Sequence, residues 1–402
     1  MPGFELFGDK ERKQVNDVLD SGVLMRYGFD GMRKGHWKAK ALEKALENRM
    51  QVNHAQLVSS GTAALTVALA CAKVGAGDEV ILPTFTFVAS FEAILSVGAI
   101  PILVDVDDTL TLDPIAVEEA ITHKTKVVMP VHMCGSMADL AALKSICDKH
   151  NLLLLEDACQ AIGGSYEGKP LGSYGDLGCF SFDYVKTITC GEGGAIITNN
   201  TEYYKSADQY SDHGHDHIGK DRGAEDHPIL GYNYRISELH AAVGLAQIER
   251  LDDFIAIQKK NYSILRSALE KIPGISFRRV PNGGIENYSF LSFYMPSEEM
   301  ARETIKAFSE NGVDTCFYWY DNNWHYYRKW EHLKNLNSLN SHSKEIKDGL
   351  PNYNSMDFSK SDVWVSRNIS CLIKLGWTEE EVTSRAEKMV NVLQNIVDIS
   401  DY

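Results

Sequence analysis

The chain has 402 residues, 44% of them hydrophobic, so it is long enough for two domains around a large apolar core. Its formal net charge of -15 argues against a general nucleic-acid or anionic-membrane surface, because lysine and arginine provide most of the binding to such partners. No stretch approaches the roughly 18 apolar residues of a membrane span, and the first residues lack a secretory-signal pattern, so a cytoplasmic protein is expected.

The eight cysteines lie far apart and include no Cys-x-x-Cys pair. This spacing disfavours zinc knuckles and a disulfide framework. Most of the cysteines are therefore expected to be buried thiols.

Residues 9–21 predict an amphipathic helix closed by Gly22, and residues 37–50 predict a second helix. Short apolar runs then alternate with helical stretches. The runs lie at 55–59, 79–82, 101–104, 126–131, 152–156, 179–182 and 195–198. The helical stretches between them include 62–74, 90–97, 117–121 and 137–150. Several runs are apolar without alternation, as strands buried on both faces are, so the layout predicts an α/β fold with a mostly parallel central sheet.

Ligands of such sheets collect at the carboxyl ends of the strands, which directs attention to the residues found there. After the first run, Gly61, Thr62 and Ala63 open a helix, whose free N–H groups and dipole suit a phosphate. An ordinary N-cap without a ligand is the alternative for so short a motif. After the second run, Phe87 could stack on a flat ring, although core packing is the usual role of one phenylalanine.

Two carboxylates, Glu156 and Asp157, end the fifth run, and strand alternation sends them to opposite faces. A carboxylate so close to a buried sheet needs a partner, and a protonated ring nitrogen would serve. The sixth run brings Ser181 and then Lys186, which stands before a glycine-rich turn. A lysine amine attacks carbonyls when it is neutral, and Val185 could contribute to the apolar setting that this requires. The alternative is an ordinary surface lysine.

These residue types together provide a phosphate turn, a stacking aromatic, a carboxylate, a hydroxyl and an amine, all at one predicted sheet edge. Such a set suits pyridoxal phosphate. The amine would form the Schiff base, the carboxylate would keep the pyridine nitrogen protonated, and the helix N-terminus would hold the phosphate.

Over nearly its whole length the chain resembles the sugar aminotransferases of the DegT/DnrJ/StrS type, which are fold-type I pyridoxal-phosphate enzymes. The residues that carry this resemblance are Lys186 and the stretches 59–63, 85–90, 156–158, 191–194 and 231–242. Relatives with histidine at the lysine position perform dehydration, so the lysine of this chain favours transamination.

The resemblance implies that Lys186 forms the Schiff base and that Asp157 pairs with the pyridine nitrogen. It implies that Phe87 stacks on the ring and that Gln160 contacts the ring face or its hydroxyl edge. The residues that it assigns to the phosphate are Gly61, Thr62, Ala63 and Ser181.

Asn233 corresponds to an asparagine that reaches the cofactor phosphate of the neighbouring subunit, so a homodimer with two shared sites is expected. Asp183 stands where relatives often carry histidine or another residue, and the resemblance assigns it no role.

Residues 213–227 are rich in histidine, with His213, His215 and His217 at alternate positions. Imidazoles beside Asp212 and Asp216 could bind a metal, but the glycines of this stretch indicate a mobile loop rather than a rigid site. The histidines, with Lys220 and Arg222, suit an anionic acceptor better. No metal is therefore expected.

Residues 237–272 are helical in period and are expected to bridge to a smaller domain that begins near Pro273. The predicted order of elements in this domain is strand 289–295, helix 298–310, strand 313–318, an irregular segment, strand 368–373 and a final helix with a capping box at 378–381. The predicted division is an N-terminal arm and large cofactor-binding domain at 1–250, then a linking helix and small α+β domain at 251–402.

Residues 316–326, here called the aromatic segment, mix aromatic side chains with amides and suggest a sugar-facing loop, although core packing is the usual reading of aromatics. With residues 213–223, this segment most resembles the aminotransferases that make 8-amino-3,8-dideoxy-manno-octulosonate for lipopolysaccharide. The resemblance implies that glutamate converts the cofactor to pyridoxamine phosphate, which then aminates the C8 aldehyde of 3-deoxy-manno-octulosonate. The candidate acceptor contacts are His215, His217, Arg222 and His325.

Three alternatives stay open. The same chemistry could act on a nucleotide-linked 4-keto sugar, the histidine run could serve a metal-dependent hydrolase, or the fold could bind without catalysis. A dinucleotide dehydrogenase is disfavoured because no Gly-x-Gly-x-x-Gly follows an early strand.

Overall fold

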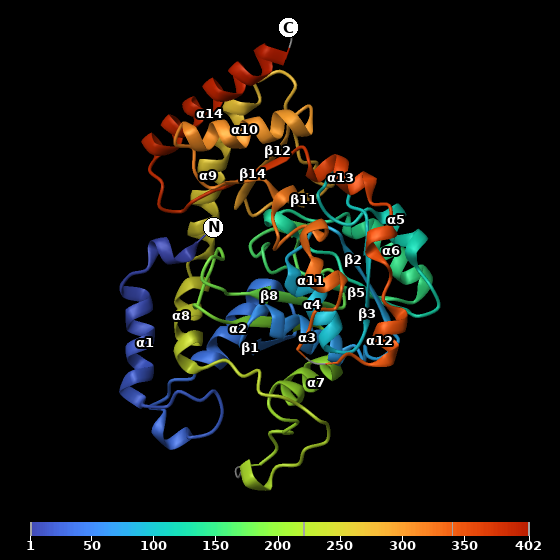
Figure 1. Ribbon diagram of the computed structural model, residues 1–402. Helices are drawn as coiled ribbons and strands as arrows, with labels where there is room; N and C mark the ends of the chain where they lie inside the picture. Colours follow the sequence, from blue (N-terminus) through green and yellow to red (C-terminus); the bar gives the residue numbers. More distant parts are fainter. Residues whose placement is uncertain (1, 220–221, 340, 401–402) are drawn as a thin grey trace.

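The computed structural model describes residues 2–219, 222–339 and 341–400. Its main feature is a seven-stranded sheet with the order β1-β9-β8-β5-β4-β2-β3 (Figure 1). Strand β9 runs antiparallel to β1 and β8, and the other neighbouring pairs are parallel, so the predicted mostly parallel sheet is confirmed. The strands are β1 (His54–Val58), β2 (Glu79–Pro83), β3 (Ile100–Val104), β4 (Thr125–Val128), β5 (Leu153–Asp157), β8 (Leu177–Ser181) and β9 (Gly194–Thr198).

Helices cover this sheet and connect its strands. They are α1 (Asp9–Ser21), α2 (Lys38–Met50), α3 (Gly61–Cys71), α4 (Val88–Ser96), α5 (Pro114–Ala120), α6 (Leu140–His150), α7 (Thr201–Ser211) and α8 (Glu238–Ile248). Helix α3 is apolar on all sides because it packs against β8 and β9 as well as against α4 and α7. The N-terminus of this central helix therefore has a fixed position at the sheet edge.

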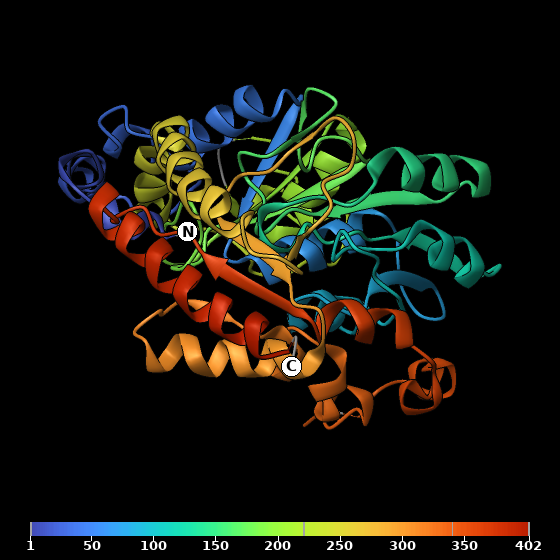
Figure 2. The ribbon, with the colours of Figure 1, turned by 90° about the horizontal axis from the view of Figure 1, so that it is seen from above.

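A second, antiparallel sheet with the order β10-β12-β14-β13 forms the C-terminal part of the molecule. Its strands are β10 (Ser276–Phe277), β12 (Phe290–Tyr294), β13 (Cys316–Phe317) and β14 (Asn368–Leu372). Helices α9 (Leu251–Leu269), α10 (Glu298–Glu310) and α14 (Glu379–Ser400) share one apolar core with this sheet. Figure 2 shows α10 and α14 side by side. A small sheet of β6 (Ser165–Tyr166), β7 (Lys169–Pro170) and β11 (Gly284–Ile285) joins the two parts.

Residues 319–365 form short helices that pack against the large sheet rather than against α9 and α14. These are η5 (Trp319–Asp321), η6 (Tyr327–Lys329), α11 (Glu331–Lys334), α12 (Lys344–Gly349), η7 (Tyr353–Ser355) and α13 (Ser359–Val365). Buried Trp330 and Tyr353 contact Phe91 of α4 edge to face, and Thr86 N–H donates to the carbonyl of His325 over 3.0 Å. The aromatic segment is thereby attached beside the end of β2. The division at residue 250 stays a prediction.

Most predicted elements appear within a few residues of their expected bounds, but two differ and one helix was not predicted. The helix expected over 237–272 is two helices, because the chain breaks between α8 and α9 at Arg250. Strand β13 is shorter than expected, since Thr315 before it adopts a positive φ of 56°. Helix α7 was not predicted. The capping box is confirmed, as Thr378 N–H donates to Glu381 Oε2 over 2.7 Å.

All eight cysteines are free thiols, and six of them are buried, as expected. Across the described ranges, every helix is too short or too polar to cross a bilayer.

Candidate active site

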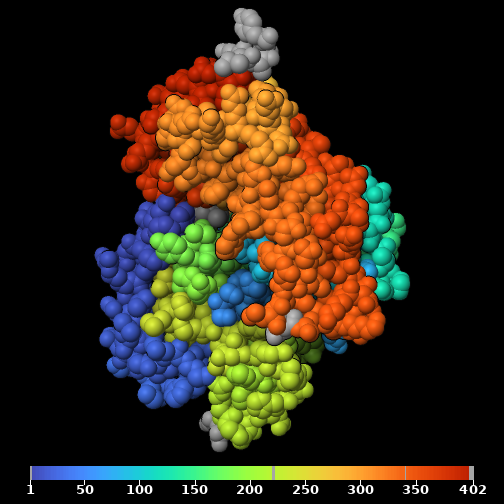
Figure 3. Space-filling model, viewed as in Figure 1, coloured from blue at the N-terminus to red at the C-terminus, as the bar shows by residue number. Residues whose placement is uncertain are grey.

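A cavity of about 510 Å³ lies between the carboxyl edge of the large sheet and the aromatic segment. In Figure 3 the orange atoms of the C-terminal part stand beside a hollow bordered by blue and green atoms of the large sheet's part. The predicted residues that line the cavity are Gly61, Thr62, Phe87, Asp157, Gln160, Ser181, Lys186 and His325. The fold therefore brings together residues from five separate stretches of sequence.

The first wall is the N-terminus of α3. Ser60 caps this helix, because its Oγ accepts the N–H of Ala63 over 3.0 Å. The N–H groups of Gly61 and Thr62 have no hydrogen-bond partner in the described part of the chain. A Cβ at Gly61 would lie 2.7 Å from the Cβ of Ser181, so only glycine fits there. The two free N–H groups and the helix dipole form an anion site. The N–H of Ala63, which was also predicted to hold the phosphate, donates to the Ser60 cap instead.

The end of β5 separates its two carboxylates as predicted. Glu156 is fully buried away from the cavity, 2.9 Å from Nε2 of His132, and it accepts the N–H groups of Gly172, Tyr174 and Gly175. These contacts satisfy its charge within the fold. Glu156 is therefore structural.

Asp157 faces the cavity, and two hydrogen bonds fix its orientation. Its Oδ2 accepts the hydroxyl of Ser90 over 2.8 Å, and its Oδ1 accepts the N–H of Cys159 over 3.2 Å. Ser90 lies 2.7 Å from the hydroxyl of Thr86. No separate signal in the sequence pointed to Ser90, which lies within the stretch 85–90 that carried the resemblance.

Lys186 lies on the turn between β8 and β9, residues 182–190, here called the lysine turn. The carbonyl of Phe182 closes this turn by accepting the N–H of Cys190 and the hydroxyl of Thr189. The N–H of Lys186 donates to the carbonyl of Asp183 over 3.0 Å. Lys186 is half-buried and its side chain contributes to the cavity wall.

Aromatic rings form the opposite wall. Phe87 stacks on Trp324 with ring centroids 5.5 Å apart, and His325 lies 4.6 Å from Trp319. Burial lowers the pKa of His325 to about 3, and the nearby charge of Lys186 acts in the same direction. His325 is therefore neutral. Its Nδ1 lies 2.9 Å from Oδ1 of Asn322, which assigns the proton to Nδ1 and leaves Nε2 as an acceptor.

Gln160 borders the cavity with its amide fixed at one end. Its Oε1 accepts the N–H of Cys134 over 2.9 Å, which leaves Nε2 as the donor available to a ligand. Cys134 adopts a positive φ of 55° in the loop after β4, and nothing in the sequence predicted this contact.

The other predicted acceptor contacts lie away from this cavity within one subunit. His217 stands between Asp208 and Asp212, with its ring nitrogens 2.8 and 3.0 Å from their carboxylates. Arg222 donates to the same Asp212, and Arg235 forms a further ion pair with it. Within one chain, His217 and Arg222 pair with these carboxylates and do not line the cavity, so their predicted contact with an acceptor has no support there.

His215 and Asn233 also lie outside the cavity. His215 lies 3.0 Å from Glu225, and Asn233 is exposed beside Asp212. Lys220 lies outside the described residues. Among the residues that the structure describes, no three His, Cys, Asp or Glu side chains are grouped to hold a metal ion.

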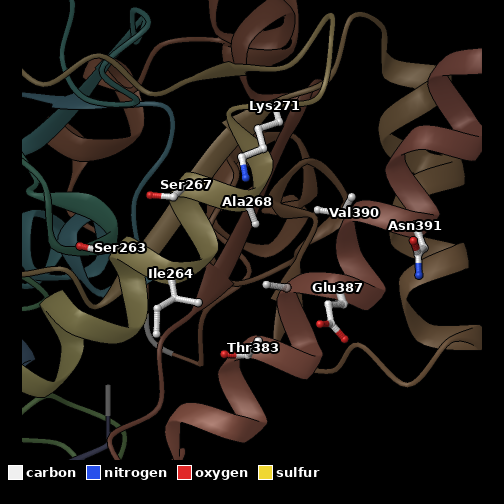
Figure 4. A pocket seen from close by; sticks show the side chains of 10 residues that line it. Ser263, Ile264, Ser267, Ala268, Lys271, Thr383, Glu387, Val390 and Asn391 are labelled. Carbon is white, nitrogen blue, oxygen red and sulfur yellow. The ribbon is translucent and has the colours of Figure 1, made fainter.

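A second, more open hollow of about 820 Å³ lies between α9 and α14 (Figure 4). Its lining includes Ile264, Ser267 and Lys271 from α9 and Thr383, Glu387 and Val390 from α14. None of the predicted site residues lines it.

Comparison with known proteins shows the family of the chain. The profile of the DegT/DnrJ/EryC1/StrS aminotransferase family matches residues 7–382. The chain belongs to this family. It is 36% identical over 303 residues to the GDP-perosamine synthase of Vibrio cholerae, covering 75% of this chain and 79% of that protein.

Solved structures of aminotransferases confirm the predicted fold class. The structure of 3-amino-5-hydroxybenzoic acid synthase superposes with a TM-score of 0.79 at 30% identity, covering 97% of both chains. An aminotransferase from Psychrobacter cryohalolentis gives a TM-score of 0.83 at 26% identity, covering 97% of this chain and 98% of that one. The chain is an aminotransferase that depends on pyridoxal phosphate, as predicted.

The residues of the cavity fit this cofactor. The glycine cradle at Gly61 and the free N–H groups beside it suit the phosphate, and the oriented carboxylate of Asp157 suits a protonated pyridine nitrogen. When bound, the cofactor supplies an aldehyde that takes up an amino group and a ring that accepts electrons. Lys186 is the amine in the cavity that can hold or move a proton at the reacting carbon.

Proposed function

We propose that this aminotransferase transfers the amino group of glutamate to the C8 aldehyde of 3-deoxy-manno-octulosonate. The product would be 8-amino-3,8-dideoxy-manno-octulosonate, made in the cytoplasm for lipopolysaccharide. One observation carries the proposal. The aromatic segment, which resembles the enzymes of this reaction, places Asn322, Trp324 and His325 in the same cavity as Lys186.

The lining offers a sugar both polar and flat contacts. Neutral His325 has an acceptor at Nε2, and the amide of Asn322, whose Oδ1 contacts that ring, keeps its Nδ2 donor for a hydroxyl. Trp324 is 57% exposed, so one part of its ring is available to the apolar face of a sugar while the other packs on Phe87.

In the chemical step, Lys186 would take a proton from one of the two carbons that flank the transferred nitrogen and return it to the other. Ser90 and the Cys159 N–H fix both oxygens of Asp157, so this carboxyl group would be held in place to pair with the ring nitrogen. Phe87 and Trp319 line the cavity, and such apolar walls would limit the access of water to the reacting atoms.

We further propose that the active unit is a homodimer in which the partner's Asn233 completes each site. The segment that carries Asn233 exposes large apolar side chains, with Ile218 at 75% and Leu230 at 76%. Such a patch is typical of a protein interface. The same segment holds His215 and His217, so dimerisation would also decide whether they approach a bound acceptor.

A nucleotide-linked 4-keto sugar is the second candidate acceptor. It is favoured by the name of the Vibrio cholerae relative, GDP-perosamine synthase, and by a relative of the same name in Escherichia coli O157:H7. A nucleotide would have to extend past Trp324, at the exposed side of the cavity.

The test is a single-turnover experiment on the protein loaded with pyridoxamine phosphate. The C8-aldehyde octulosonate and a GDP-linked 4-keto sugar are added separately, and the visible absorbance of the pyridoxal form is followed. Return of this absorbance with the octulosonate alone supports the proposal. Return with the nucleotide sugar alone overturns the acceptor assignment. A Lys186→Ala variant serves as the control for amino transfer in the absence of the lysine amine.

A further inference from the structure

The N-terminal segment η1 (Gly3–Leu6) lies directly against the lysine turn. The N–H of Gly3 donates to the carbonyl of Lys186 over 3.0 Å. The ring of Phe4 stacks on that of Tyr184, with centroids 4.2 Å apart and an interplanar angle of 5°. Figure 3 shows the blue N-terminal atoms next to the green atoms of this region. A residue 183 positions away in sequence therefore contacts the backbone of the proposed nucleophile.

The side chain of Gln247 in α8 bonds to both sides of this contact. Its Nε2 donates to the carbonyl of Gly3 and, over 2.8 Å, to Oε1 of Glu11, and its Oε1 accepts the N–H of Thr189 over 3.4 Å. The side chain is fully buried. One amide thus connects η1, α1 and the lysine turn, and its position depends on all three.

Gly3 also leaves no room for a side chain. A Cβ there would lie 2.1 Å from Oε1 of Gln247 and 2.7 Å from the carbonyl oxygen of Thr187. Atoms cannot approach so closely, so any larger residue must move η1, Gln247 or the turn. By contrast, a Cβ at Gly8 would have no atom within 4 Å.

The lysine turn needs such support because its apex contributes little packing of its own. Tyr184 and Val185 are 53% and 50% exposed, and Tyr184 is covered mainly by Phe4. At the other end of η1, Glu5 accepts the N–H of Gly376 over 2.8 Å, just before α14. The segment is therefore attached both to the turn and to the C-terminal part.

We propose that η1, through Gly3 and Phe4, together with Gln247, positions the lysine turn and so sets where the amine of Lys186 stands. These are positioning residues, and the inference rests on the role proposed for Lys186. A displacement of about 1 Å of a reacting group can cost roughly 100-fold in rate, so a small shift of this turn has a large effect.

The test uses the holoenzyme and compares Gly3→Ala with Gly8→Ala, and Phe4→Ala with Phe4→Tyr. Four quantities are measured: the rate at which glutamate bleaches the bound pyridoxal phosphate, the cofactor dissociation constant, the pH midpoint of its visible absorbance, and amide hydrogen exchange in residues 183–190. None of them depends on the sugar acceptor.

Gly3→Ala and Phe4→Ala are expected to slow the glutamate reaction by about 10- to 100-fold, move the absorbance midpoint and speed exchange in the turn. Gly8→Ala and Phe4→Tyr are expected to match the native protein. A lower melting temperature with an unchanged midpoint and unchanged exchange in the turn would show a merely structural role and overturn the proposal. If Lys186→Ala keeps native turnover, the role of the lysine fails instead, whatever η1 does.

Discussion

Ser90 donates a 2.8 Å hydrogen bond from its hydroxyl to Oδ2 of Asp157, and both side chains are buried at the cavity wall. Ser90→Ala removes this donor and leaves the carboxylate with one fewer partner. A hydrogen bond to a charged group is worth about 1.5–3 kcal/mol, so we expect pyridoxal phosphate to bind about 10- to 100-fold more weakly. Equilibrium titration of the apoprotein, followed by visible absorbance, measures this change.

Ser96→Ala is the matched control, because Ser96 lies on the same helix and its hydroxyl bonds to Ala93 and Thr66, away from the cavity. Native affinity in Ser90→Ala would mean that the Cys159 N–H alone suffices to orient Asp157.

Lys186→Ala is expected to abolish turnover, because it removes the amine that the cavity offers to the reacting carbon. Product formation over many cycles, measured with glutamate and the sugar acceptor, is the relevant quantity. Lys205→Ala, at an exposed position of α7, controls for loss of a surface charge. Normal multiple turnover by the Lys186 variant would refute the assignment of this residue.

His217 is expected to make stability depend on pH. Hydrogen bonds and charges from Asp208 and Asp212 outweigh burial and raise the pKa of His217 from 6.5 to about 9. Because the pKa is higher in the folded state, this contribution is complete below pH 6.5 and disappears as the pH rises through about 9. It corresponds to about 3 kcal/mol.

His217→Gln should therefore differ most from the native protein near pH 6, and the difference in unfolding free energy should shrink by about 3 kcal/mol up to pH 9.5. Denaturant unfolding at several pH values measures it. His123→Gln, at an exposed position, should show no such trend. A difference that stays constant with pH would mean that the pKa of His217 is the same in the folded and the unfolded protein.

The part of the site built by the large sheet was predictable because its signals are local. Asp157, Ser181 and Lys186 stand at or just after apolar runs, and parallel strands bring their carboxyl ends to one edge. Gly61 was predictable for the same reason, because its motif requires only a strand followed by the N-terminus of a helix.

Contacts across long sequence distances were not predictable in this way. Periodicity cannot show that Thr86 bonds to the backbone of His325, or that Gly3 bonds to Lys186. The histidine stretch shows a further limit. His217 was expected to meet a substrate, but Asp208, on a helix that was not predicted, is one of the groups that occupy its ring nitrogens within the subunit.

Mixing two inactive variants tests the shared site. Asn233 is exposed and does not line the cavity of its own chain, whereas Lys186 does. If each site uses Lys186 of one subunit and the partner's Asn233, a mixed dimer of Lys186→Ala and Asn233→Ala has one site with both defects and one intact site. Random mixing in equal amounts should then restore about a quarter of native activity, since half of the dimers are mixed and half of their sites work. Activity after joint unfolding and refolding, compared with each variant treated alone, measures this. Recovery fails if both residues serve the site of the same subunit, because every site in the mixture then carries one defect.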